Sequence, residues 1–171
     1  MDLLKLLREE HSKKQTDRIV SYIGADKNRF AELMKLFLKG EYRITQRAAW
    51  PLSYCVRYHP ELIGPYFARL LDNLGRKDIH IAVIRNTVRL LQDVTIPKRY
   101  HGRVMTACFD FVQAAETPIA VKAFSLSILS NLSADYPEIL PELKLIIDEQ
   151  WEHATPAFRS RARKILKNMG S

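Results

Sequence analysis

Residues 31–63 read AELMKLFLKGEYRITQRAAWPLSYCVRYHPELI, and this stretch decides the fold. Apolar residues recur at steps of three and four on both sides of Gly40, as on one face of an α-helix, so Gly40 is predicted to separate two helices. Pro60 then opens PELIGPYFARLLDNL, which resembles PEILPELKLIIDEQW from Pro137. A third proline, Pro97, lies 37 residues after Pro60 and 40 before Pro137. This period predicts an array of helical repeats.

The helical pattern continues through the rest of the chain, and strand-like alternation is nowhere sustained. Two short helices are predicted first, followed by four helix pairs. The predicted ranges are 2–10 and 13–23, then 28–38 with 43–58, 61–74 with 79–94, 98–114 with 118–134, and 138–153 with 156–169. Gly24 is a predicted helix stop. Thr117 and Thr155 are predicted N-caps, because each precedes a proline that suits the first helical position.

The second helix of the first pair carries a recognisable motif near its start, made of Arg47, Ala48, Ala49 and Leu52. Lys122-Ala123 and Arg161-Ala162 are partial echoes of it in later pairs. With a leucine-rich first helix before the motif and a proline opening the next unit, the chain resembles the HEAT-repeat (armadillo-like) family over about residues 27–170. The resemblance implies an all-α fold, an α-α superhelix or HEAT-like solenoid of about four helix pairs plus an N-terminal helical cap.

No linker-like stretch divides the sequence, so a single domain over 1–171 is expected. Its parts are a cap at 1–26 and repeats at 27–59, 60–96, 97–136 and 137–170. Neither helix of a pair buries its apolar stripe alone, so successive pairs should stack around one continuous core.

The charge of the chain is concentrated in the second helices of the pairs. Counted over residues 43–58, 78–93, 117–135 and 156–169, they carry +8 in total, equal to the net charge of the chain. The first helices, counted over 27–39, 60–75, 97–113 and 138–152, sum to zero. In HEAT-like arrays the second helices line the concave face, so the resemblance implies a basic inner surface. The candidate partner-binding residues on it are Arg47, Trp50, Arg57, Arg85, Arg89, Lys122, Arg159, Arg161 and Arg163.

Three interpretations of this basic face stay open. The cations could be structural, because a terminal repeat needs a polar outer face and arginines often bridge neighbouring repeats. Arginines beside an aromatic side chain are also typical of a polyanion track, which makes nucleic acid the alternative partner. The third interpretation is an acidic protein partner. A non-catalytic scaffold that binds a protein through the concave face is the preferred function.

No catalytic pattern is present, so an enzyme, a cofactor and a metal are not expected. The five histidines are scattered, and neither a Gly-rich phosphate loop nor a nucleophile elbow occurs. Glu149 and His153 share one helix face, but two ligands are too few for a tight metal site. A HEAT-like alkylpurine DNA glycosylase is a remote enzymatic alternative, with Asp93 as its nearest acid candidate.

Cys55 and Cys108 lie in apolar helical stretches and are predicted to be reduced core thiols. The longest apolar runs are far shorter than the roughly 20 residues that span a bilayer, so no membrane span is expected. The acidic start MDLLKLLREE does not look like a secretion signal, which makes the cytoplasm the expected location. The sequence leaves the oligomeric state open.

Overall fold

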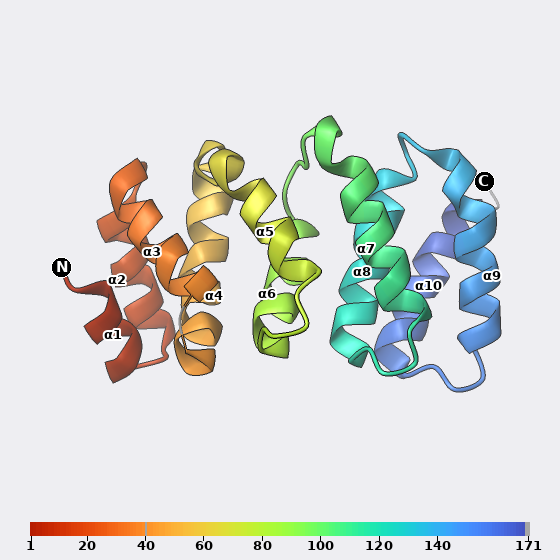
Figure 1. Ribbon diagram of the computed structural model, residues 1–171, viewed down its shortest axis with the longest axis horizontal. Coiled ribbons are helices and arrows are strands. Elements are labelled where there is room, and N and C mark those ends of the chain that lie inside the picture. Colours follow the sequence, from red (N-terminus) through yellow and green to blue (C-terminus); the bar gives the residue numbers. More distant parts are fainter. Residues whose placement is uncertain (40, 170–171) are drawn as a thin grey trace. The chain divides into compact units, whose positions relative to one another are not determined.

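The computed structural model describes residues 1–39 and 41–169, and every regular element in these ranges is helical. Two positions of the sequence predictions lie outside the described residues, namely Gly40 and residue 170, the end of the last predicted repeat. The chain divides into two compact units, Met1–Thr95 and Ile96–Ser171, which are described separately (Figure 1). The expectation of a single domain stays a prediction.

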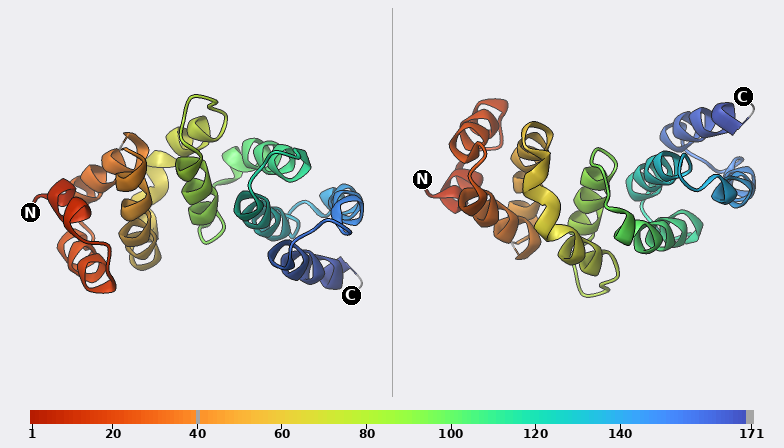
Figure 2. Two further views of the ribbon diagram at one scale, coloured as in Figure 1. Left: turned by 90° about the horizontal axis from the view of Figure 1, so that it is seen from below. Right: turned by 90° about the horizontal axis from the view of Figure 1, so that it is seen from above.

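The first unit is built around helix α4. Its elements are α1 (Leu3–Glu9), α2 (Lys13–Ile23), α3 (Lys27–Lys39), α4 (Tyr42–Tyr58), the 3-10 segment η1 (Pro60–Tyr66), α5 (Phe67–Leu74) and α6 (Ile81–Leu91). Helix α4 packs against α2 of the N-terminal cap and against α6, the second helix of the next pair, while α3 packs on α4 and α5 on α6 (Figure 2). The short helix α1 contacts both α3 and α4. The two N-terminal helices are thus packed onto the first repeat as a cap.

The helix ends in this region follow from short polar residues and one glycine. Asp2 caps α1 by accepting a 3.0 Å hydrogen bond from the backbone N–H of Lys5. Ser12 caps α2 in the same way. Gly24 ends α2 with a φ of 47°, a left-handed value that residues with a Cβ rarely adopt. The predicted stop at Gly24 is confirmed.

The second unit contains two helix pairs. Its elements are η2 (Lys98–Tyr100), α7 (His101–Gln113), α8 (Ile119–Leu132), η3 (Pro137–Ile139), α9 (Leu140–Gln150) and α10 (Pro156–Met169). Helix α8 packs against α7 and α10, and α10 also contacts α9. Hence α8 and α10, the second helices of the two pairs, lie in contact with each other, as α4 and α6 do in the first unit.

The three recurring prolines each begin a short 3-10 segment that leads into a first helix. Pro60 and Pro137 are the first residues of η1 and η3, and Pro97 is the N-cap of η2. The α-helical parts therefore begin later than predicted, at residues 67, 101 and 140. Proline lacks an N–H and is favoured in the first turn of an α-helix rather than in its interior, so Pro65, inside η1, delays the α-helix further.

Two of the predicted second-helix starts need correction. Thr117 is not the N-cap of α8; Pro118 holds that position, and its carbonyl accepts from the N–H groups of Val121 and Lys122 at 2.9 and 3.1 Å. Helix α6 begins at residue 81 rather than 79, because the ring Nδ1 of His80 caps it by accepting from Ala82 at 3.0 Å. The cap at Thr155 is confirmed, since its Oγ1 accepts from Phe158 N at 3.4 Å and α10 begins at the next residue.

Both cysteines lie in the apolar core as predicted. Cys55 on α4 and Cys108 on α7 are buried free thiols. Burial raises the pKa of each thiol from its ordinary value of 9.0 to about 12. Neither thiol is therefore ionised near neutral pH.

Candidate functional site

An aromatic and cationic surface lies where α2 and α4 pack together in the first unit. We call it the aromatic surface and define it as Lys13, Trp50, Tyr54, Arg57 and Tyr58. Lys13 Nζ lies 4.6 Å from the centre of the Tyr54 ring, and the Arg57 guanidinium lies 5.4 Å from it. Two cations thus hold one tyrosine ring, an arrangement favoured by the negative face of the aromatic π-system.

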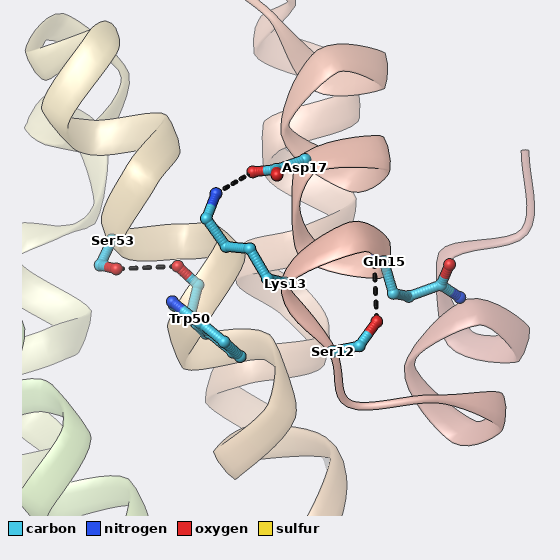
Figure 3. Close-up of polar contacts among 6 residues, drawn as sticks. All are labelled: Ser12, Lys13, Gln15, Asp17, Trp50 and Ser53. Carbon is cyan, nitrogen blue, oxygen red and sulfur yellow. Dashed lines mark hydrogen bonds and ion pairs between the residues drawn. The ribbon is translucent and has the colours of Figure 1, made fainter.

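Lys13 is fixed in this position by its own helix. Its ammonium group pairs with Asp17 one turn further along α2 (Figure 3). The hydrogen bond to Asp17 raises the pKa of Lys13 above its ordinary value, against a smaller opposite effect of desolvation. Lys13 therefore remains a cation beside Tyr54, although sequence analysis did not select it.

The aromatic residues of this surface differ in how far they are exposed. Trp50 is half-buried, and its ring makes an edge contact with His11 at a centroid distance of 5.3 Å. Figure 3 shows Trp50 on α4 across from Ser12 and Lys13, at the start of α2. Tyr58, in contrast, is 61% exposed and lies 6.2 Å from Tyr54. The accessible part of the surface is thus formed by Tyr58 and Arg57 more than by Trp50.

Arg47, a predicted partner contact, bonds within its own unit. Its guanidinium donates to the carbonyl oxygens of Leu7 and Arg8, at 2.9 and 2.7 Å. These carbonyls belong to the last turn of α1, where no further helical N–H is available. Arg47 therefore ties the C-terminal end of α1 to α4.

We expect Arg47→Ala to lower the free energy of unfolding by about 2 kcal/mol, because hydrogen bonds from a charged donor are lost and carbonyls are left unpaired. Arg57→Ala is the matched control, since Arg57 lies on the same helix but is exposed, and it should change stability by less than about 0.5 kcal/mol. Urea denaturation followed by circular dichroism measures both values. Equal effects of the two substitutions would contradict the role assigned to Arg47.

The remaining candidates of the first unit lie on α6. Arg85 is half-buried there and Arg89 is exposed. Asp93, the acid considered for a glycosylase, is exposed just beyond the C-terminal end of this helix. These three positions supply charge along α6, and no catalytic arrangement follows from them.

In the second unit, Lys122 links α8 to α9. Its Nζ donates to Gln150 Oε1 at 3.1 Å, and Gln150 Nε2 donates to Val112 O at 2.6 Å. Burial lowers the pKa of Lys122, and the charge of Glu116 partly offsets this effect. Lys122 also lines a cavity of about 420 Å³ together with Glu149 and His153.

The arginines of α10 are not equivalent. Arg159 donates to the carbonyls of Trp151 and Glu152, at distances of 2.9 to 3.1 Å, and so caps the end of the preceding segment. Arg159 and Arg163 both lie over the Trp151 ring, at 5.7 and 5.6 Å from its centre. Arg161 instead donates to the Ser127 hydroxyl on α8 and lies 5.2 Å from the ring centre of Phe124.

Arg161 lines a polar cavity between α8 and α10, which we call the serine pocket. Its volume is about 530 Å³. Its lining is formed by Ser127, Ser130, Asn131, Ala157, Ser160, Arg161, Lys164 and Ile165. Sequence analysis missed it because its serines come from helices of different repeats and are unremarkable within each helix.

The nine candidate residues thus fall into two groups. Arg47, Trp50, Arg57, Arg85 and Arg89 belong to Met1–Thr95, and Lys122, Arg159, Arg161 and Arg163 belong to Ile96–Ser171. Within residues 1–39 and 41–169, no three metal-ligating side chains form a cluster. In these same ranges no helix combines the length and the apolar character needed to cross a bilayer.

Comparison with known proteins agrees with the helical architecture. A family model described as a HEAT repeat domain matches residues 3–169. No curated protein and no solved structure matches the chain significantly. HEAT repeats are helical scaffolds that typically mediate protein interactions, and the match includes the N-terminal helices that the resemblance from sequence left as a cap. Because the match spans nearly the whole sequence, this chain belongs to the HEAT-repeat family.

Proposed function

We propose that this protein is a non-catalytic binding module that holds a protein partner on the aromatic surface. The observation that carries the proposal is the Tyr54 ring, which both Lys13 and Arg57 contact and which lies beside the exposed Tyr58. Tyrosine, tryptophan and arginine are the residues that contribute most to protein–protein affinity. A ring that is already held in place loses less conformational entropy on binding, which favours affinity.

The chemistry of the surface favours a partner segment with acidic residues next to an apolar or aromatic side chain. Lys13 and Arg57 offer positive charge at the edge of the tyrosines, and the net charge of +8 attracts acidic proteins during encounter. The proposed location is the cytoplasm, where buried reduced thiols such as Cys55 and Cys108 persist.

Nucleic-acid binding is the competing proposal, and the five bases of α10 favour it. Arg159 already bonds to carbonyls of its own unit, however, which favours a structural role for this arginine over phosphate contacts. The two proposals differ in salt dependence, since phosphate contacts weaken steeply as salt increases. A glycosylase, the remote third proposal, would release a free base from alkylated DNA.

The test is quantitative affinity capture with three forms of the protein. The unmodified chain is compared with Tyr54→Ala/Tyr58→Ala and with the control Tyr42→Ala. Tyr42 lies on the same helix and is exposed, but its ring contacts His80 instead. We expect a partner whose affinity falls at least about tenfold in the double variant and is unchanged in the control.

Two results would contradict the proposal. The first is a partner retained equally by all three forms in a direct titration with the purified proteins. The second is binding of duplex DNA that weakens steeply with salt and disappears when Arg159, Arg161 and Arg163 are reversed to glutamate. The second result would establish the nucleic-acid proposal instead.

A further inference from the structure

The serine pocket has a lining of hydrogen-bond donors. Helix α8 contributes Ser127, Ser130 and Asn131, while α10 contributes Ser160, Arg161 and Lys164. Each of these six side chains carries an N–H or O–H group, and the hydroxyl proton of Ser127 is donated to Ala123 O. Among the described residues that line the pocket, none is acidic. The pocket therefore presents two positive charges and a polar lining to an anion.

One of the two cations is held in place before any ligand arrives. The Arg161 guanidinium donates to Ser127 Oγ and lies 5.2 Å from the centre of the Phe124 ring. Ser127 Oγ in turn donates to the carbonyl of Ala123 at 3.3 Å, which orients the hydroxyl. A guanidinium is a rigid planar group, so the contact with Ser127 fixes the orientation of its whole positive charge. Such preorganisation lowers the entropic cost of binding.

The two positive charges of the pocket match a phosphate monoester better than other anions. A phosphorylated hydroxyl carries about −1.5 to −2 charge near neutral pH and three strong acceptor oxygens. A carboxylate or a phosphodiester carries a single charge, which leaves one of the two cations unmatched. The cavity of about 530 Å³ lies within the roughly 300–1,000 Å³ typical of ligand sites, so it also has room for the group that bears the phosphate.

We propose that the serine pocket binds a phosphate monoester. This proposal is independent of the proposed function, because the aromatic surface belongs to the other unit. Two sources supply this chemistry, a phosphorylated serine or threonine of a protein and a small phosphorylated metabolite. Both present the same dianionic group to Arg161 and Lys164.

The test is isothermal titration calorimetry of the full chain at physiological salt. The probes are a short peptide with one phosphoserine, its unphosphorylated form, free phosphoserine, inorganic phosphate and a short single-stranded oligonucleotide. We expect the phosphoserine probes to bind at least about tenfold more tightly than the unphosphorylated peptide and the oligonucleotide. If the phosphopeptide binds more tightly than free phosphoserine and inorganic phosphate, the source is a protein; if they bind equally, it is a small phosphate compound.

Substitutions in the lining test whether the probes bind in the serine pocket. Lys164→Gln removes an exposed charge from the pocket lining and should lower the affinity for the phosphoserine probes about tenfold. Ala157→Glu puts a carboxylate into the lining and should lower this affinity further. The substitution should not destabilise α10, because an acidic side chain in the first turn of a helix is favourable to the helix dipole. The matched control is Arg163→Gln, which removes the same charge from the same helix over Trp151, outside the pocket. It should leave the affinity within about twofold.

Three results would overturn the proposal. One is the absence of heat with every phosphorylated probe at millimolar concentration. Another is an equal loss of affinity for the phosphoserine probes in Arg163→Gln and Lys164→Gln, because binding would then depend on the general positive charge of α10 and not on a defined site. The third is an oligonucleotide that binds as tightly as the phosphopeptide. Since Lys164 and Ala157 are exposed, loss of folding does not explain an effect of either substitution, and thermal denaturation of each variant checks this.

Discussion

Native protein is expected to react with a thiol reagent at pH 8 about a thousandfold more slowly than the unfolded chain. Both thiols, Cys55 and Cys108, are buried, and burial raises the pKa of each from 9.0 to about 12. The thiolate is the reactive species, so this shift alone lowers the reactive fraction at pH 8 by about a thousandfold. The measurement is the absorbance released from an aromatic disulfide reagent, in buffer and in concentrated guanidinium.

Ser160→Cys supplies the control, because residue 160 is exposed and a thiol there should react at an ordinary rate in the folded protein. Rapid stoichiometric labelling of either native cysteine would contradict the core placement. The same pKa shifts also predict a pH dependence. Above pH 9 the unfolded thiols lose protons that the native thiols keep, so stability should fall progressively between pH 9 and about 12.

Leu126→Ala is expected to lower the free energy of unfolding by about 3 to 4 kcal/mol. Leu126 lies on α8 with none of its surface exposed, so the substitution removes buried apolar surface and leaves a cavity. Leu145→Ala makes the same chemical change on α9, where the leucine is 59% exposed, and should change stability by less than about 0.5 kcal/mol. Urea denaturation with an unchanged m-value measures both.

The Leu126 variant also tests the predicted single domain. If the chain unfolds as one cooperative domain, the whole denaturation curve shifts to lower urea. If Ile96–Ser171 unfolds separately from Met1–Thr95, only part of the signal shifts and the curve becomes biphasic. Two transitions in the unmodified protein would contradict the single-domain prediction directly.

The helices could be predicted from the sequence because apolar spacing and capping residues are local signals. Gly24 and Thr155 are examples, since each acts on its own helix end and both predictions are confirmed. The starts of three first helices were predicted too early, because Pro60, Pro97 and Pro137 begin 3-10 segments whose apolar pattern resembles that of an α-helix. At Pro118 and His80 the cap depends on backbone geometry that a proline or a histidine only partly determines.

The candidate site was harder to predict because its contacts join distant parts of the chain. Arg47 belongs to the motif that identifies the fold, yet its partners are carbonyls of α1. Carbonyl groups occur at every residue, so no sequence signal marks them as partners. Similarly, the approach of Lys13 to Tyr54 and the pairing of Arg161 with Ser127 depend on how neighbouring helices align. The charge pattern identified the basic helices but not which cations are already bonded.

The bond between Arg47 and α1 has a consequence for biosynthesis. Helix α1 has seven residues, too few to be stable alone in water, and it is translated before α4, which carries Arg47. Its stabilising guanidinium lies 40 residues downstream of Leu7. At translation rates of about 5–20 residues per second, roughly 2 to 8 s pass before that side chain is made. Helix α1 thus acquires this stabilising contact only after α4 has been made, and its apolar leucines stay available to chaperones during this interval.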